Sequence, residues 1–501
     1  MAIFLNRLSF LLIGGTVCSV ALAPAIGQQA MLQPIAGQPS GQSGLTGRSV
    51  SPVLAPQPTT GAAGTGSGVS ITLDYLSTLR YDENLGLDDP SLGSTSRWEN
   101  TLALGVINQT PISTLTFNLS GLHRLSDQPT IGGNAEFNDP AARLSYTRNT
   151  GNSSIAALAE YRETDLTFNQ TLTDINQDGI IDNADIVIDR GTRASSRAGL
   201  TWQTGINDPL GFIFNYNRRE RDYQNTNDPG LFDNLINDYT LTALLRLSPV
   251  LQGNVRVRYT DYTAEDVPGT DRQTTTLTTG VTYDASAVTK VDASVGVTQV
   301  DETLSAVPSN TTDEDFVASF AVTRDMPNGT ATALIDRTFG TNGDRTNATV
   351  GRALLLPTGT LDFNIGASYG ASGNTTAIGD ITYVHTLPSS QVTASLRRQV
   401  GTSTQSVETK QTLASLDYDY LINPLSSVTL GVAYVDQQNE GSGSTNRRQR
   451  SNFNAAYNRV LTENWSMTVG YQYSYNDDNG PGTADSNAVY VTLGRQFLLK
   501  P

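Results

Sequence analysis

The sequence predicts an all-β fold: a transmembrane, antiparallel, up-and-down β-barrel of about 22 strands, with short periplasmic turns and longer external loops. Three observations lead to this prediction. Apolar and polar residues alternate with a period of two through most of residues 69–501. Two classes of break, one short and one long, alternate between these segments. After the N-terminus, no apolar run approaches the roughly 18 residues that a transmembrane helix needs.

The N-terminus has the pattern of a secretory signal peptide. Arg7 is the only charge before an apolar run over residues 8–23, and Ala23 and Ala25 offer a small-residue cleavage site. We therefore expect residues 1–25 to be removed. Cys18, the only cysteine, lies in this segment, so the mature chain needs no disulfide in an oxidising compartment.

Residues 26–68 are rich in Gln, Pro, Gly and Ser, and Arg48 is their only charge. Such a segment cannot bury enough apolar surface to offset the entropy of ordering. It predicts a disordered periplasmic linker, too short for the plug domain of a large transporter. A periplasmic partner for this linker is one possibility that the composition leaves open.

The strands are clearest where one face is aliphatic or aromatic and the other is Thr, Ser, Asn, Gly, Arg or Asp. This alternation is sharpest in residues 115–120, 255–260, 361–365 and 465–475. Side chains of a strand point to opposite faces in turn. Each of these segments therefore predicts a strand with one apolar face.

The breaks between strands distinguish a membrane barrel from a soluble β fold. Short breaks often contain proline, as at Asn207-Asp-Pro209, whereas long breaks are polar and acidic, as at residues 224–233. About ten short and eleven long breaks predict about 22 strands, an even number that returns both chain ends to the periplasmic side. A soluble β-solenoid, or a string of sandwiches, would show the same turn chemistry at every break.

The last strand carries a second signal. In residues 484–501, Val489, Val491 and Leu493 alternate with polar residues. The segment resembles the C-terminal signal of bacterial outer-membrane barrels, which implies recognition by the barrel assembly machinery through Thr492, Gly494, Phe497 and Leu499. It departs from many such signals because two further residues follow the last apolar one.

From residue 69 to its end, the chain resembles the outer-membrane β-barrel porins of proteobacteria at the level of pattern. The resemblance implies a Gram-negative outer-membrane location, contact with outer-membrane lipid and a channel function. It specifies neither a solute nor an oligomeric state.

The charge balance points to the polar faces of the strands as the functional surface. The formal net charge of −16 disfavours nucleic acid as a partner, and arginine carries nearly all the positive charge. Arginine stays charged and binds carboxylates and phosphates bidentately. The alternation predicts lumen-facing charges at Glu160, Arg162, Arg256, Arg258, Asp292, Asp362 and Arg397. These charges would either set pore selectivity or brace the wall through cross-strand salt bridges.

One external insertion, residues 168–190, contains a motif with the spacing of a calcium loop. It resembles the dockerin variant of the EF-hand loop, with oxygen donors in order and Gly179 at the sharp turn. The predicted structural calcium ligands are Asp174, Asn176, Asp178, the Ile180 carbonyl, Asp182 and Asp185. The last ligand is Asp where Glu is usual, and no amphipathic helix flanks the loop.

The sequence predicts no enzyme. Its only histidines are His123 and His385, so a three-histidine metal site is excluded. We expect a porin or channel that passes small polar or anionic solutes, or a polysaccharide, by diffusion through a charged lumen. The alternative is a non-conducting surface scaffold or adhesin with acidic calcium-binding loops. A remote alternative is an outer-membrane lipase built on His123 with Ser120 or Ser126.

The calcium motif gives a direct prediction. The intact barrel should bind calcium in the millimolar range typical of external sites, and Asp178→Ala should remove the response because it deletes a ligand oxygen. Isothermal titration of both proteins measures this. A response of the same size in the variant would contradict the assignment.

Overall fold

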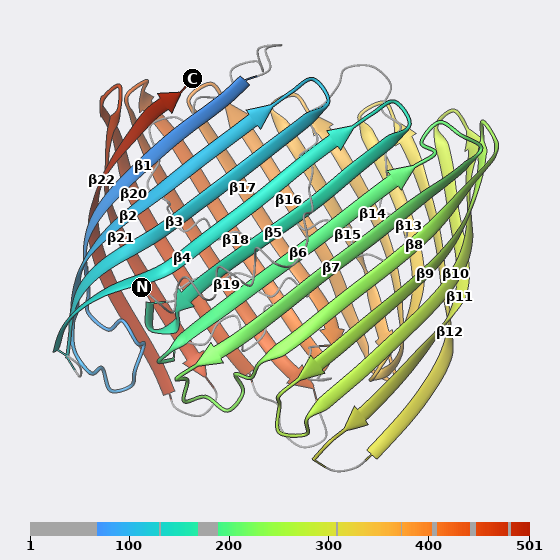
Figure 1. Ribbon diagram of the computed structural model, residues 1–501, viewed down its shortest axis with the longest axis horizontal. Coiled ribbons are helices and arrows are strands. Elements are labelled where there is room, and N and C mark those ends of the chain that lie inside the picture. Colours follow the sequence, from blue (N-terminus) through green and yellow to red (C-terminus); the bar gives the residue numbers. More distant parts are fainter. Residues whose placement is uncertain are drawn as a thin grey trace.

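One closed sheet makes up nearly all of the computed structural model (Figure 1), which describes residues 68–129, 132–168, 189–306, 309–371, 373–402, 408–440, 447–478 and 482–500. The first eleven strands are β1 (Gly68–Asp82), β2 (Thr95–Gln109), β3 (Ser113–Gln128), β4 (Gly132–Asn149), β5 (Ser153–Asp165), β6 (Thr192–Thr204), β7 (Leu210–Gln224), β8 (Asn234–Ser248), β9 (Leu251–Ala264), β10 (Thr270–Ser286) and β11 (Thr289–Leu304). The remaining strands are β12 (Ser309–Met326), β13 (Gly329–Gly340), β14 (Gly343–Leu356), β15 (Gly359–Gly370), β16 (Thr375–Leu387), β17 (Ser390–Thr402), β18 (Glu408–Asn423), β19 (Ser426–Glu440), β20 (Arg447–Thr462), β21 (Trp465–Asp478) and β22 (Gly482–Lys500).

Each strand pairs antiparallel with its neighbours in sequence, and β1 pairs with β22, so the sheet has no free edge. At the closing seam Leu79 lies opposite Val491 and Leu73 lies opposite Phe497. Closure matters because no water in a bilayer core can satisfy an unpaired backbone group. The predicted fold, an antiparallel barrel of 22 strands, is confirmed.

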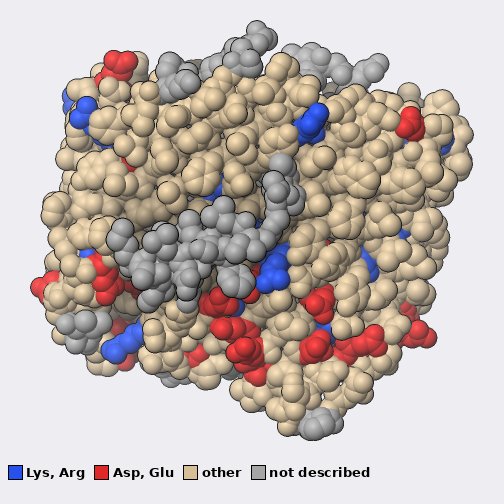
Figure 2. Space-filling view, in the orientation of Figure 1, with Lys and Arg blue, Asp and Glu red and all other residues tan. Residues whose placement is uncertain are grey.

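The two ends of the barrel differ as the two classes of break predict. The even-to-odd connections, such as β8 to β9, lie at one end, which we call the turn end; the odd-to-even connections lie at the other, the loop end. In Figure 1 the turn end is at the top, beside the C-terminus, and the loop end is at the bottom. The acidic side chains visible in Figure 2 gather toward the loop end.

The strands are longer than expected and the loops correspondingly shorter. The observed strands have 12 to 19 residues, more than the roughly ten typical of a transmembrane barrel. Residues 301–315, which are rich in polar and acidic residues, belong largely to β11 and β12, which stay paired from Asp301–Thr312 to Leu304–Ser309. Polar and acidic residues can form a ladder there, because beyond the lipid a strand needs backbone pairing but no apolar face.

The connection between β13 and β14 at the loop end is very short. The strands remain paired up to Gly340 and Gly343. Gly343 has a φ of 82°, a conformation open to glycine without strain. The chain therefore reverses direction through a two-residue turn, where the polar composition alone suggests a longer loop.

The outer face of the barrel is apolar and the inner face is polar. Outward residues at mid-strand include Leu277, Val297 and Phe320, which are all about half exposed. On the inward face, Thr78 bonds Thr492 and Thr276 bonds Thr298 through their hydroxyls, each at 2.9 Å. This is the reverse of a soluble protein and the arrangement of a transmembrane barrel, which lies with its apolar band in lipid.

Aromatic residues fall mainly on the outward set. Tyr216, Tyr239 and Tyr259 lie side by side on β7, β8 and β9, with ring centroids 5.0 and 6.2 Å apart. Tyr223 is an exception: it points inward and packs against buried Leu166 and Leu231. The outward residues of β7 have even numbers, so Tyr223 lies on the inward face.

The predicted signal peptide and nearly all of the predicted linker lie outside the described residues. The described helix η1 (Leu166–Phe168) has three residues, and no helix among the described residues has the length and apolar character to cross a membrane.

The assignment of outward and inward faces predicts how a charged substitution in the middle of a strand changes stability. Leu277→Arg should lower the free energy of unfolding by about 2–4 kcal/mol, the cost of arginine in lipid near the bilayer midplane. Thr274→Arg, an inward position on the same strand, is the matched control and should cost much less because its side chain meets water. Urea unfolding in lipid vesicles measures both, and equal losses would contradict the assigned faces.

Candidate functional site: the charged lumen wall

The inward arginines concentrate on one side of the lumen. The pairing register places them on the inward set of consecutive strands β2 to β9, and we call this surface the basic arc. Its members are Arg97, Arg124, Arg143, Arg162, Arg193, Arg197, Arg219, Arg221, Arg246, Arg256 and Arg258. Inward acids interrupt it, among them Glu99, Glu160 and Asp238.

Inward carboxylates concentrate on the strands that follow, β11 to β18, which form the acidic arc. The register places them by the same alternation. Its members are Asp292, Glu302, Asp313, Asp325, Asp336, Asp362, Asp380, Asp417 and Asp419. Basic interruptions include Lys290, Arg345 and Arg397. Because β2–β9 and β11–β18 lie on successive parts of one closed wall, the lumen is positive along one side and negative along another.

At the loop end the basic arc is braced by a continuous chain of ion pairs. Arg97 lies 3.3 Å from Asp82 and 3.5 Å from Glu99, and Glu99 in turn lies 2.9 Å from Arg124. Arg124 also contacts Asp139 at 3.0 Å and Asp165 at 3.2 Å, although its own side chain is only 4% exposed. Here the charges neutralise one another and fix five neighbouring strands.

Phe168 of η1 packs against this network. The guanidinium carbons of Arg124 and Arg97 lie 3.8 and 5.2 Å from its ring centroid. Such cation–π contacts stabilise a partly desolvated arginine. They also attach the chain after β5 to the inner wall at the loop end.

Farther from the loop end, Arg162, Arg256 and Arg258 are neutralised at most in part by the described carboxylates. Arg219 and Arg258 share one carboxylate, Asp238, each at 3.0 Å. Arg256 makes a long hydrogen bond of 3.4 Å to the Thr242 hydroxyl. Arg162 is exposed to the lumen. This part of the arc therefore carries positive charge that solutes can meet.

The seven predicted lumen charges all lie on the inward set, but they do not form one site. Arg256 and Arg258 are adjacent on β9 in the basic arc, where Glu160 lies 3.7 Å from Arg143. In the acidic arc, Asp292 accepts a hydrogen bond of 2.5 Å from Thr282. Asp362 lies on β15 and Arg397 on β17, where Arg397 is paired opposite Asp380 of β16.

Sequence reasoning missed most members of both arcs. Residues 217–222, Asn-Arg-Arg-Glu-Arg-Asp, are all polar, so their sequence does not show which of them face the lumen. In the structure Arg219 and Arg221 point inward, while Arg218 and Glu220 point outward. The two arcs emerge when the charges of the lumen-facing residues are added for each strand. This requires the pairing register of each strand, because the register determines which residues face the lumen.

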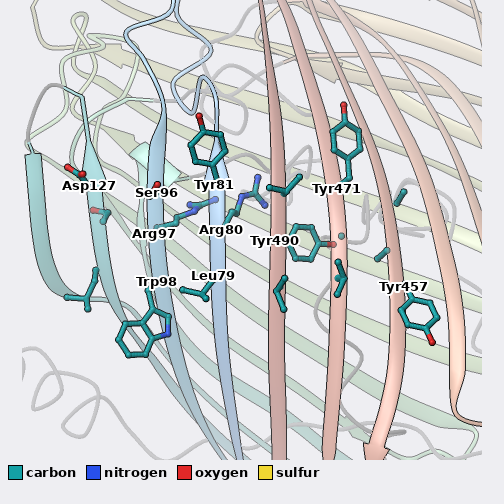
Figure 3. Close-up of a pocket in the computed structure, with 18 of the residues that line it drawn as sticks. Leu79, Arg80, Tyr81, Ser96, Arg97, Trp98, Asp127, Tyr457, Tyr471 and Tyr490 are labelled. Carbon is teal, nitrogen blue, oxygen red and sulfur yellow. The ribbon is translucent and has the colours of Figure 1, made fainter.

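An apolar groove crosses the closing seam on the outer wall (Figure 3). It is lined by outward residues such as Leu79, Trp98 and Val491, and Tyr81 and Tyr471 also line it. Because most of its lining residues belong to the outward set, the groove opens toward lipid. Inward residues between them, among them Arg97 of the basic arc, also contribute to its lining.

His123 does not support a lipase site with its nearby serines. It points outward and its ring lies 4.9 Å from that of Phe137. Ser120 and Ser126 have even numbers on β3 and so point inward, and Ser126 is buried. The predicted histidine–serine pair is therefore divided between the two faces of the sheet.

Two other sets of predicted residues have different outcomes. The calcium ligands at 174–185 lie outside the described residues, and no cluster of metal-ligating side chains occurs among the residues that are described. In the predicted assembly signal, Thr492 and Gly494 point inward, whereas Phe497 points outward against Arg495. Leu499 is exposed near the end of β22.

Comparison with known proteins supports the fold. No family model and no curated protein matches the chain. Solved structures do, at low sequence identity. The open form of the ferric-catecholate import receptor Fiu from E. coli K12 is 11% identical, with 86% of this chain and 82% of that chain covered and a TM-score of 0.54. The FrpB iron transporter from Neisseria meningitidis (F3-3 variant) is 10% identical, with coverages of 87% and 82% and a TM-score of 0.56.

The siderophore receptor PirA from Acinetobacter baumannii is a third similar structure, 9% identical, with coverages of 86% and 81% and a TM-score of 0.52. At these identities the similarity concerns the fold. The closed 22-strand barrel matches outer-membrane receptor barrels and fits an outer-membrane location.

The ion-pair network predicts unequal effects of two arginine substitutions. Arg124→Gln should lower the free energy of unfolding by about 3–5 kcal/mol, because it leaves several carboxylates without their buried partner. Arg143→Gln is the control: its side chain is 56% exposed, so the loss should stay below about 1 kcal/mol. Urea unfolding in vesicles would contradict the bracing role if both variants lost the same amount.

Proposed function

We propose that this protein is an outer-membrane channel through which small anionic solutes diffuse along the basic arc. The observation that supports this most directly is the segregation of inward charge into two arcs. The mechanism contains no chemical step. Fixed arginines raise the local concentration of anions on one side of a water-filled lumen, and the carboxylates of the acidic arc repel them from the other.

The size of this effect follows from Coulomb's law. One unpaired charge about 8 Å from a solute charge contributes roughly 0.5 kcal/mol in water, or about a twofold change in local concentration. Several arginines in sequence along the wall add to this. Salt weakens the effect because the Debye length is only about 10 Å at 0.1 M. The channel should therefore be selective at low salt and less selective at high salt.

A second candidate function is uptake of a larger anionic ligand. It is favoured by the strand number and by the similar structures, whose names describe receptors for siderophores and a ferric catecholate and an iron transporter. Transporters with 22 strands have a plugged lumen. This candidate predicts saturable ligand binding by a folded barrel with little conductance. A folded barrel that neither conducts nor binds such a ligand would favour the scaffold alternative.

Ion selectivity tests the proposed channel. In a planar bilayer with a salt gradient, the reversal potential should indicate a preference for anions over cations. Replacing Arg256 and Arg258 with glutamine should move it toward cation preference, because two charges of the basic arc are lost. The shift should be larger in dilute salt than in concentrated salt.

The opposite arc provides the matched control. Asp362→Asn with Asp380→Asn removes two inward charges of the other sign and should move the reversal potential in the opposite direction. Shifts in the same direction from both pairs, or none from either, would contradict transport along segregated charges. Heat-modifiable gel migration confirms that each variant is folded.

A further inference from the structure

The outer wall carries a second asymmetry of charge, at the turn end. Five arginines lie on the outward set of their strands, one to five residues before the strand ends. We call them the turn-end collar: Arg148 on β4, Arg324 on β12, Arg352 on β14, Arg459 on β20 and Arg495 on β22.

The pairing register fixes their direction. Arg459 lies opposite Met467 and Arg495 lies opposite Trp465, both on the outward set of β21. Arg352 lies opposite Phe363, two residues from outward Ile365. These arginines therefore share the outer surface with the apolar belt and lie at its turn-end border.

The collar lacks acidic partners. Within the described part of the chain, none of the five guanidinium groups has a carboxylate within ion-pair distance. Arg148, Arg324 and Arg459 are exposed. Arg352 donates a hydrogen bond of 2.6 Å to the amide oxygen of Asn328, and Arg495 has a buried Nε without a hydrogen-bond partner.

The outward arginines of the loop end give the contrast. Arg218 pairs with Glu220 at 3.0 Å, and Arg447 pairs with Asp436 at 2.8 Å. Arg337 contacts two carboxylates, Asp315 at 2.6 Å and Asp344 at 3.3 Å. Most outward arginines of the loop end are thus paired with acids, and Arg398 on β17, which is outward and exposed, is the exception. At the turn end all five collar arginines lack such a partner among the described residues.

Aromatic side chains position part of the collar. The guanidinium carbon of Arg495 lies 4.3 Å from the ring centroid of Phe497 and 5.1 Å from that of Trp465. Aromatic rings of this kind lie at the level of lipid head groups in membrane barrels. Arg495 is therefore held at that level, beside the apolar surface that acyl chains contact.

We infer that the turn-end collar binds the phosphate groups of anionic phospholipids in the membrane leaflet on that side. An unpaired guanidinium offers a phosphate several donors in a planar fork. Its aliphatic stem can lie along the apolar belt while its charged group reaches the head groups. Each basic residue near an anionic membrane surface strengthens binding by a factor of about five. At the loop end, acids surround the outward arginines and only Arg398 lacks an ion pair among the described residues, so the preference should be stronger in the leaflet at the turn end.

Native mass spectrometry of the purified full-length barrel tests the collar, with cardiolipin and phosphatidylcholine as probes. The wild type should retain cardiolipin in preference to phosphatidylcholine. A triple variant, Arg148→Gln, Arg324→Gln and Arg459→Gln, should retain on the order of a hundredfold less cardiolipin, because three factors of about five multiply. Arg324→Gln alone, at an exposed residue, provides a milder change and should cost about fivefold.

The matched control removes the same charge from the other end: Arg218→Gln, Arg337→Gln and Arg447→Gln. It should leave cardiolipin retention near the wild-type value. Unchanged retention in the collar variants, an equal loss in the loop-end variant, or equal retention of both lipids by the wild type would each overturn the inference. Heat-modifiable migration identifies the folded fraction that is compared.

Discussion

The pairing of β1 with β22 is the constraint on which the rest of the structure depends. A bilayer supplies no hydrogen-bond partners, so a sheet is stable there only when every strand has two neighbours. Once the sheet is closed, each strand has one face toward lipid and one toward the lumen. Because residues alternate between apolar and polar along each strand, aliphatic side chains face the lipid, and hydroxyls, amides and charged groups face the lumen.

Charge is distributed on this closed wall in two independent ways. Around the circumference, inward arginines occupy β2–β9 and inward carboxylates occupy β11–β18. Along the axis, outward acids gather at the loop end, while the outward arginines without acidic partners lie mainly at the turn end, with Arg398 the exception. The first distribution acts on solutes in the lumen, and the second acts on lipids. Ion pairs such as Arg124–Asp139 connect neighbouring strands without altering either pattern.

The fold was accessible from the sequence because the signals are local: alternation in segments such as 465–475, and two alternating classes of break. The directions of Glu160, Arg256 and Asp362 followed from the same alternation. Other features depend on contacts between distant residues. Parity assigns Arg124 to the inward face, but only the assembled strands bring Glu99, Asp139 and Asp165 to it. The strands also extend into acidic segments such as 301–315, where composition suggests a loop and ladder pairing decides the outcome.

The central claim is that alternate residues of each strand face lipid and water. The chain's one cysteine, Cys18, lies in the predicted signal peptide, so single cysteines can be placed at consecutive positions 274–279 of β10. In lipid vesicles, a membrane-impermeant thiol reagent should label the inward even positions from the aqueous lumen and leave the outward odd positions unreacted. Uniform labelling, or labelling of the odd positions instead, would contradict the account.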